Sequence, residues 1–222
     1  MSDPASSAGD IVDMASHGGW LATIFSSLAL AVSGFSFYES NLKAADLEVH
    51  VPPVIHYGRD GGGDTELFAI PVTVVNDGGR TGTVLAMELI VESLKEKKSK
   101  RYYGAYLGEH PRNPDTINRA FAPLSIAGKA TFSETVRFYP AGNPLPKLLD
   151  EAGEYRFTLK LNTARPANPD VFDRLWRSEP APLTFEMTLP WLSDQQLGFR
   201  RIAVAMHQKD YKPVSSGAAA AK

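Results

Sequence analysis

The sequence predicts an all-β domain, an antiparallel sandwich of about seven strands, preceded by one transmembrane helix and followed by a C-terminal helix. Three observations support this prediction. Residues 18–38 carry no charged side chain. Hydrophobic and polar residues then alternate over several short segments, which is typical of half-buried strands. A helical period of hydrophobic residues returns only near the C-terminus.

Composition narrows the classes of function. The chain has 222 residues, with 23 basic and 25 acidic side chains and a net charge of −2. Such a balance argues against nucleic acid as a partner, because nucleic-acid binding needs a strong positive field. The chain has no cysteine, which excludes disulfides, thiolate nucleophiles and cysteine-ligated metals.

The uncharged segment at residues 18–38 is long enough to cross a bilayer. Its 21 residues make a helix of about 31 Å, close to the ~30 Å hydrocarbon core. Trp20 lies near one end and Tyr38 at the other, where aromatic rings favour the headgroup level. We expect a disordered acidic tail over 1–17, a retained anchor over 18–38 and a linker over 39–45.

A cleaved signal peptide is the alternative to a retained anchor. Ala31-Val32-Ser33 offers a cleavage site between small residues, but no basic residue precedes the segment. Both orientations stay open. The basic residues after the span favour a cytoplasmic domain by the positive-inside rule, whereas single-span proteins with short tails often place the domain outside.

Small residues recur through the span with spacings of three and four, which places them on one helical stripe. This stripe predicts close packing against another membrane protein or a second copy. The alternative is that common small residues fell on one face by chance. The stripe consists of Ala22, Ser26, Ala29, Ser33 and Ser36.

The soluble domain is expected over residues 46–190. Alternating patterns predict strands near 47–51, 68–74, 85–91, 101–107, 132–138, 155–161 and 183–189. Several short strands without long intervening helices favour a sandwich. Ser193 and Gln196 have the spacing of a capping box, so we expect a C-terminal helix over 191–208 and a flexible tail over 209–222.

Two local patterns resemble an immunoglobulin-like β-sandwich. One is the strand that ends Val74-Val75-Asn76-Asp77-Gly78-Gly79, which is similar to a corner of bacterial adhesion-type domains. The other is Gly153-Glu154-Tyr155, which resembles a tyrosine corner. A sandwich on a single span also resembles a class of uncharacterised bacterial membrane proteins. The resemblance implies structural turn roles for Asn76, Gly78, Gly79, Arg80 and Tyr155.

No motif predicts catalysis, a cofactor or a metal. Gly78–Gly82 is followed by a strand rather than a helix, so these glycines indicate a hairpin turn that needs positive φ and not a phosphate-binding loop. Residues 59–64 indicate a hairpin tip. The five histidines are scattered. We therefore expect no enzyme.

Two surfaces are candidates for binding. One is a basic loop that could meet anionic lipid or stay solvated, and it contains Lys95, Lys97, Lys98, Lys100 and Arg101. The other lies in the long connection 163–182, which either binds a partner or covers the open end of the sandwich. Its candidate partner-binding residues are Phe172, Arg174, Trp176 and Arg177.

These features predict a single-pass protein-interaction domain in the bacterial inner membrane, an accessory or assembly subunit of a membrane complex. Its expected partners are the lipid bilayer and another membrane protein or itself. The alternative function is an envelope carrier of a metal or small ligand with a sandwich fold.

Overall fold

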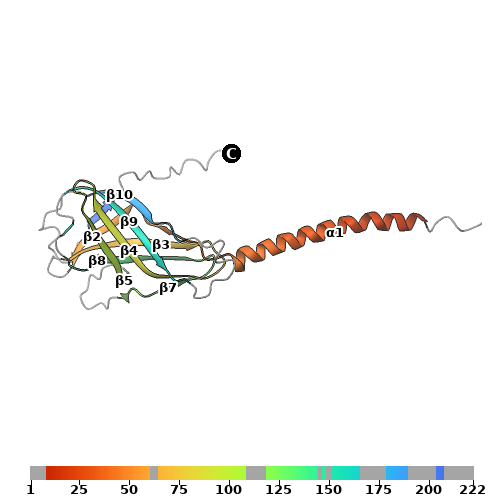
Figure 1. Cartoon of the computed structure of the whole chain (residues 1–222), viewed down its shortest axis with the longest axis horizontal. Coiled ribbons are helices and arrows are strands. Elements are labelled where there is room, and N and C mark those ends of the chain that lie inside the picture. The colour runs from red at the N-terminus through yellow and green to blue at the C-terminus, as the bar shows by residue number, and fades with distance from the viewer. Residues whose placement is uncertain are drawn as a thin grey trace, which may run out of the picture.

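The N-terminal part of the chain is one long helix. The computed structural model describes residues 9–60, 65–108, 119–144, 147–148, 152–165, 179–189 and 204–207. Helix α1 spans Gly9–Phe37 and continues into one π-helical turn, η1, over Tyr38–Leu42. Figure 1 shows α1 extending away from one end of the β domain.

The helix begins earlier than the hydrophobic pattern predicts. The expected disordered tail is wrong over residues 9–17, and the expected linker is helical as far as Leu42. No proline follows Pro4 within this segment, so no missing backbone N–H interrupts the helical hydrogen bonds.

The rest of the described chain is β-structure, which confirms the all-β prediction. All strand pairs are antiparallel. The strands are β1 (Leu47–His50), β2 (Val54–Asp60), β3 (Thr65–Asn76), β4 (Gly82–Ser93), β5 (Ser99–Leu107), β6 (Arg119–Ala120), β7 (Leu124–Ile126), β8 (Thr131–Pro140), β9 (Gly153–Thr163), β10 (Leu183–Leu189) and β11 (Val204–His207).

One hydrogen-bonded sheet connects these strands in the order β10-β9-β4-β5-β8-β3-β2-β11, with β1 on β3, β6 on β5 and β7 on β4. The two outermost strands of this order, β10 and β11, also contact each other. The sheet therefore curls into a nearly closed barrel, and we call it the barrel below.

The core fills the inside of the barrel with alternate side chains from each strand, as the period of two requires. Phe68 lies at its centre, with its ring 5.0 Å from that of Tyr102 and 5.5 Å from that of Phe157. Each ring is fully buried. Their edge-to-face geometry is the one that aromatic quadrupoles favour.

Two sequence expectations are wrong. Regular alternation over the strand expected at 85–91 would bury Leu85, but Leu85 is 48% exposed while Val84 is buried, because a β-bulge between Val84 and Ala86 shifts the alternation by one residue. The C-terminal helix expected over 191–208 is absent over Val204–His207, which forms β11 against β2. The remaining residues of that expected helix lie outside the described residues.

Strand direction defines two ends of the barrel. β3 runs towards the attachment of α1 and ends at Asn76, and β4 runs back from Gly82 to Ser93. We call the end of the barrel at Asn76 the helix end and the end at Ser93 the far end. Each strand has 12 residues, so the two ends lie about 40 Å apart at ~3.3 Å per residue.

Candidate functional site

The helix end is organised around the buried side chain of Asn76. Its Oδ1 accepts hydrogen bonds from the backbone N–H groups of Asp46 (3.1 Å) and Gly78 (3.0 Å). Its Nδ2 donates to the carbonyl oxygens of Arg80 (2.8 Å), Ile126 (3.0 Å) and Ala127 (3.0 Å). One fully buried amide thus ties three chain segments together.

Close backbone approach explains the two glycines after Asn76. A Cβ on Gly78 would overlap the carbonyl oxygen of Ala44, and one on Gly79 would lie 2.7 Å from the carbonyl carbon of Ser40. The N–H of Gly79 donates to Lys43 O at 3.0 Å. The loop after β3 therefore lies directly against the segment that leaves α1.

This arrangement corrects the expected role of the glycines. Gly78 and Gly79 are not among the positive-φ glycines of the described chain. β3 and β4 also do not pair with each other, because β3 pairs with β1, β2 and β8 and β4 pairs with β5, β7 and β9. The turn crosses the helix end rather than closing a hairpin.

Charged side chains add contacts at the same junction. Glu39 on η1 lies 3.6 Å from Lys43 and 3.7 Å from Lys129. The N–H of Lys129 donates to Gly78 O at 3.0 Å. The segment expected as a linker is thus held to the barrel through backbone bonds, and it couples the direction of α1 to the barrel.

Helix α1 itself presents an apolar surface to its surroundings. Residues Gly19–Leu42 form a stretch long and apolar enough to cross a membrane, and none of it is buried in the structure. Leu30 is 74% exposed and Phe25 67%. The small-residue stripe from Ala22 to Ser36 lies on this exposed helix.

The far end contains a second polar centre around Glu66, whose side chain is fully buried. Its carboxylate accepts from Tyr57 Oη at 3.1 Å, Tyr102 Oη at 2.9 Å and the N–H of Leu148 at 3.0 Å. Lys100 Nζ lies 3.5 Å away. These contacts join β2, β3 and β5 to the segment before β9.

The environment of the two tyrosines changes their ionisation. Burial, followed by the nearby negative charge of Glu66, raises the pKa of Tyr57 and of Tyr102 far above the ordinary value. Both phenols therefore keep their protons and remain donors to the carboxylate. The hydrogen bonds of this centre hold the far end together.

The residues of the predicted basic loop also lie at the far end of the barrel. The tip between β4 and β5 carries Lys95, Lys97 and Lys98, and Lys98 pairs with Glu96 at 2.8 Å. Lys100 contacts Glu66, and Arg101 lies 3.7 Å from Glu88. This loop is about 40 Å from the helix end.

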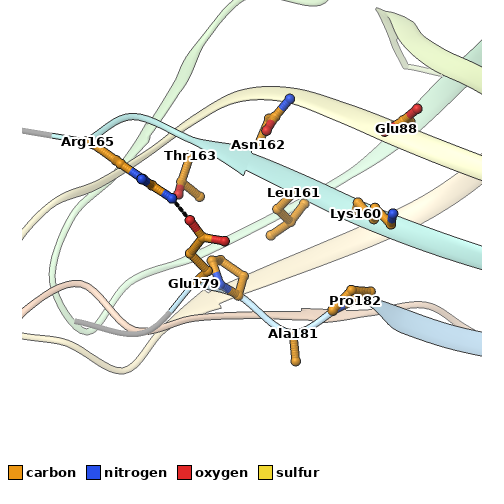
Figure 2. Close-up of a pocket in the computed structure, with 10 residues that line it drawn as sticks. Glu88, Lys160, Leu161, Asn162, Thr163, Arg165, Glu179, Ala181 and Pro182 are labelled. Carbon is orange, nitrogen blue, oxygen red and sulfur yellow. Dashed lines mark ion pairs between the residues drawn. The ribbon is translucent and has the colours of Figure 1, made fainter. Parts of the chain in front are cut away.

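A groove of about 620 Å³ opens beside the C-terminal half of β9. Figure 2 shows Leu161 and Thr163 facing the segment 179–182, which forms the opposite wall. Arg165 and Glu179 form an ion pair at one end of the groove. Glu88 on β4 and Lys160 on β9, which lie opposite each other in the sheet, also line the groove.

Several predicted site residues stand apart from these centres. Phe172, Arg174, Trp176 and Arg177 lie outside the described residues. Tyr155 is buried at the far end, opposite Ser93, and so does not join the Asn76 junction. Within the described ranges, no group of three histidine, aspartate or glutamate side chains could hold a metal ion.

The sequence gives only part of the signal for these sites. The Asn-Asp-Gly-Gly motif marks the junction, but nothing near it in sequence marks its carbonyl partners at residues 126 and 127. Glu66 follows a glycine-rich tip and reads as a surface charge. Its burial depends on tyrosines that lie 9 and 36 residues away.

Comparison with known proteins adds a limited likeness of fold. No protein-family model and no curated protein sequence matches the chain. The chain is similar to the solution structure of a candidate late embryogenesis abundant (LEA) protein, with 18% identity over 86% of this chain and 95% of that one, at a TM-score of 0.36. It is also similar to a candidate ApaA protein from Bordetella pertussis, with 17% identity over 76% and 98% of the two chains and a TM-score of 0.28.

Proposed function

We propose that the chain is a single-pass membrane protein whose immunoglobulin-like barrel binds other proteins as an accessory or assembly subunit. The observation that carries this proposal is the bare apolar surface of Gly19–Leu42. Soluble monomers rarely expose so much contiguous apolar surface. A bilayer covers it, and the length of about 36 Å is sufficient for a span.

The junction at Asn76 gives the anchor a mechanical role. Because the residues after α1 are bonded to the loop after β3, the barrel has a defined direction relative to the helix. The far end then lies about 40 Å from the lipid surface. A barrel held in this way presents its loops and edges to a partner at a fixed height.

Mild detergent extraction of the full chain from its own membrane tests the binding function. The expected result is co-migration with at least one other protein in size-exclusion chromatography with light scattering. Migration as a single monomer, with the helix intact, contradicts an accessory-subunit function.

A further inference from the structure

We infer that the groove beside β9 is a docking site for an extended peptide segment of a partner protein, which pairs with the open edge of β9 at Leu161 and Thr163. The inference specifies the partner class for the protein-interaction function proposed above. Its structural basis lies in the barrel and is independent of the anchor.

The register of the sheet leaves this edge open. Pairing of β10 with β9 begins at Leu183 opposite Leu159. β9 continues for four more residues, 160–163. These residues pair with β4, which lies along the opposite edge of β9 from β10. Within the described ranges, no strand pairs with the second edge of residues 160–163.

The alternation of backbone groups identifies which atoms face the open edge. Glu154 O accepts from the N–H of Leu94, and the N–H of Ala164 donates to Thr83 O. Even-numbered residues of β9 therefore direct their N–H and C=O groups towards β4. Because neighbouring residues of a strand point in opposite directions, Leu161 and Thr163 direct theirs towards the groove.

The opposite wall keeps the edge from closing. Residues 179–182 are not part of β10, and they contain Pro180 and Pro182. Each proline fixes φ near −65° and restricts the residue before it, which favours polyproline geometry over a paired strand. The wall thus runs beside β9 and leaves a groove of about 620 Å³ between the two.

An extended peptide matches this site better than other ligands. A row of unpaired N–H and C=O groups is complementary to another strand. Leu161 and Thr163 point to the groove side and are half-buried, so they suit a small apolar side chain on the peptide. The next peptide side chain would point outwards, on the side of Lys160.

Selection from a displayed library of random 12-residue peptides, against the full chain in detergent micelles, supplies the probe. The selected peptide is then synthesised with an N-methyl group at each position in turn. Strand pairing predicts that methylation weakens binding at every second residue only, since alternate N–H groups face the protein. It also predicts slower hydrogen exchange of the Leu161 and Thr163 amides in the complex.

Thr163→Pro is the matching change in the protein. It removes an N–H that faces the groove and no hydrogen bond to β4, and binding is expected to weaken about tenfold, equivalent to about 1.4 kcal/mol. Leu161→Glu, which places a charge in the groove, is expected to weaken binding similarly. Thr131→Ala, at an exposed position on β8 away from the groove, is the control and should bind like the wild type.

The outcomes separate this inference from the proposed function. An N-methyl scan without a period of two, unchanged binding by both groove variants, protection of other amides or failure to select any peptide overturns docking at β9. A peptide that binds elsewhere on the barrel overturns docking at the β9 edge and leaves the protein-interaction function standing. A chain that docks the peptide at β9 but leaves its membrane as a monomer keeps this inference and loses the accessory-subunit function.

Discussion

The side-chain amide of Asn76 donates a hydrogen bond of 3.0 Å to the carbonyl oxygen of Ile126, fifty residues later in the chain. This bond joins the end of β3 to the end of β7 beneath the attachment of α1. With its partner bonds to Arg80 and Asp46, it makes the helix end a single bonded unit.

Asn76→Asp should destabilise the barrel by about 3 kcal/mol, because a carboxylate cannot donate to the three carbonyl oxygens that the amide satisfies. Denaturant unfolding of the full chain in detergent measures the change. Asn162→Asp, at an exposed position on β9, is the control and should cost less than about 0.5 kcal/mol. Equal effects of the two substitutions would remove the special role of Asn76.

Gly78→Ala should loosen the coupling between α1 and the barrel, because the new methyl group overlaps the backbone at Ala44. The chain has no cysteine, so spin labels at Val32→Cys and Glu48→Cys report the distance between helix and barrel. The distance distribution is expected to broaden for Gly78→Ala. It should stay narrow for Gly34→Ala, whose surroundings on α1 are open.

The barrel should lose stability as pH rises above about 10. The raised pKa values of Tyr57 and Tyr102 keep both protonated in the folded state, while the unfolded state loses those protons near pH 10. Each tyrosine contributes a slope of about 1.4 kcal/mol per pH unit. Unfolding free energies between pH 9.5 and 11.5 test this.

In the same measurement, Tyr102→Phe should reduce the slope of the unfolding free energy against pH, above about pH 10, by the contribution of one tyrosine. Tyr103→Phe, on the neighbouring and exposed residue of β5, is the comparison. An alkaline slope that Tyr102→Phe leaves at the wild-type value would show that this phenol does not stay protonated in the folded barrel.

Ser26→Leu with Ser33→Leu should weaken association of α1 in membranes about fivefold or more, since leucines prevent close approach along the small-residue stripe. Energy transfer between labelled copies in vesicles measures self-association. Ile24→Leu with Leu28→Ile conserves volume away from the stripe and serves as the control. Unchanged association with Ser26→Leu and Ser33→Leu argues against packing of two copies through this face.

Sequence patterns predict the strands whose alternation stays regular. Phe157 and Leu159 are both buried, as regular alternation predicts. The bulge in this strand pair lies on β4, and β9 has no extra residue. The exposure of Leu85 departs from regular alternation, because a bulge depends on the neighbouring strands and leaves no local mark in the sequence. β2, which follows Pro52-Pro53, was missed because His56, Gly58 and Arg59 obscure its apolar pattern.

The candidate sites were predictable to different degrees. The motif at Asn76 to Arg80 gave the right place, but close packing against residues 40–45, and not positive φ, explains its glycines. The open edge at Leu161 could not be predicted, because it depends on where β10 begins relative to β9. Such registers arise from tertiary packing, which a single sequence does not encode locally.

The central claim is that α1 remains in the mature protein as a membrane anchor. Sedimentation of membranes after an alkaline carbonate wash, followed by intact-mass measurement of the chain, tests it most directly. The account predicts the full chain in the membrane pellet, released only by detergent. A chain that stays in the supernatant uncut, or one whose mass shows cleavage near Ser33, would contradict it.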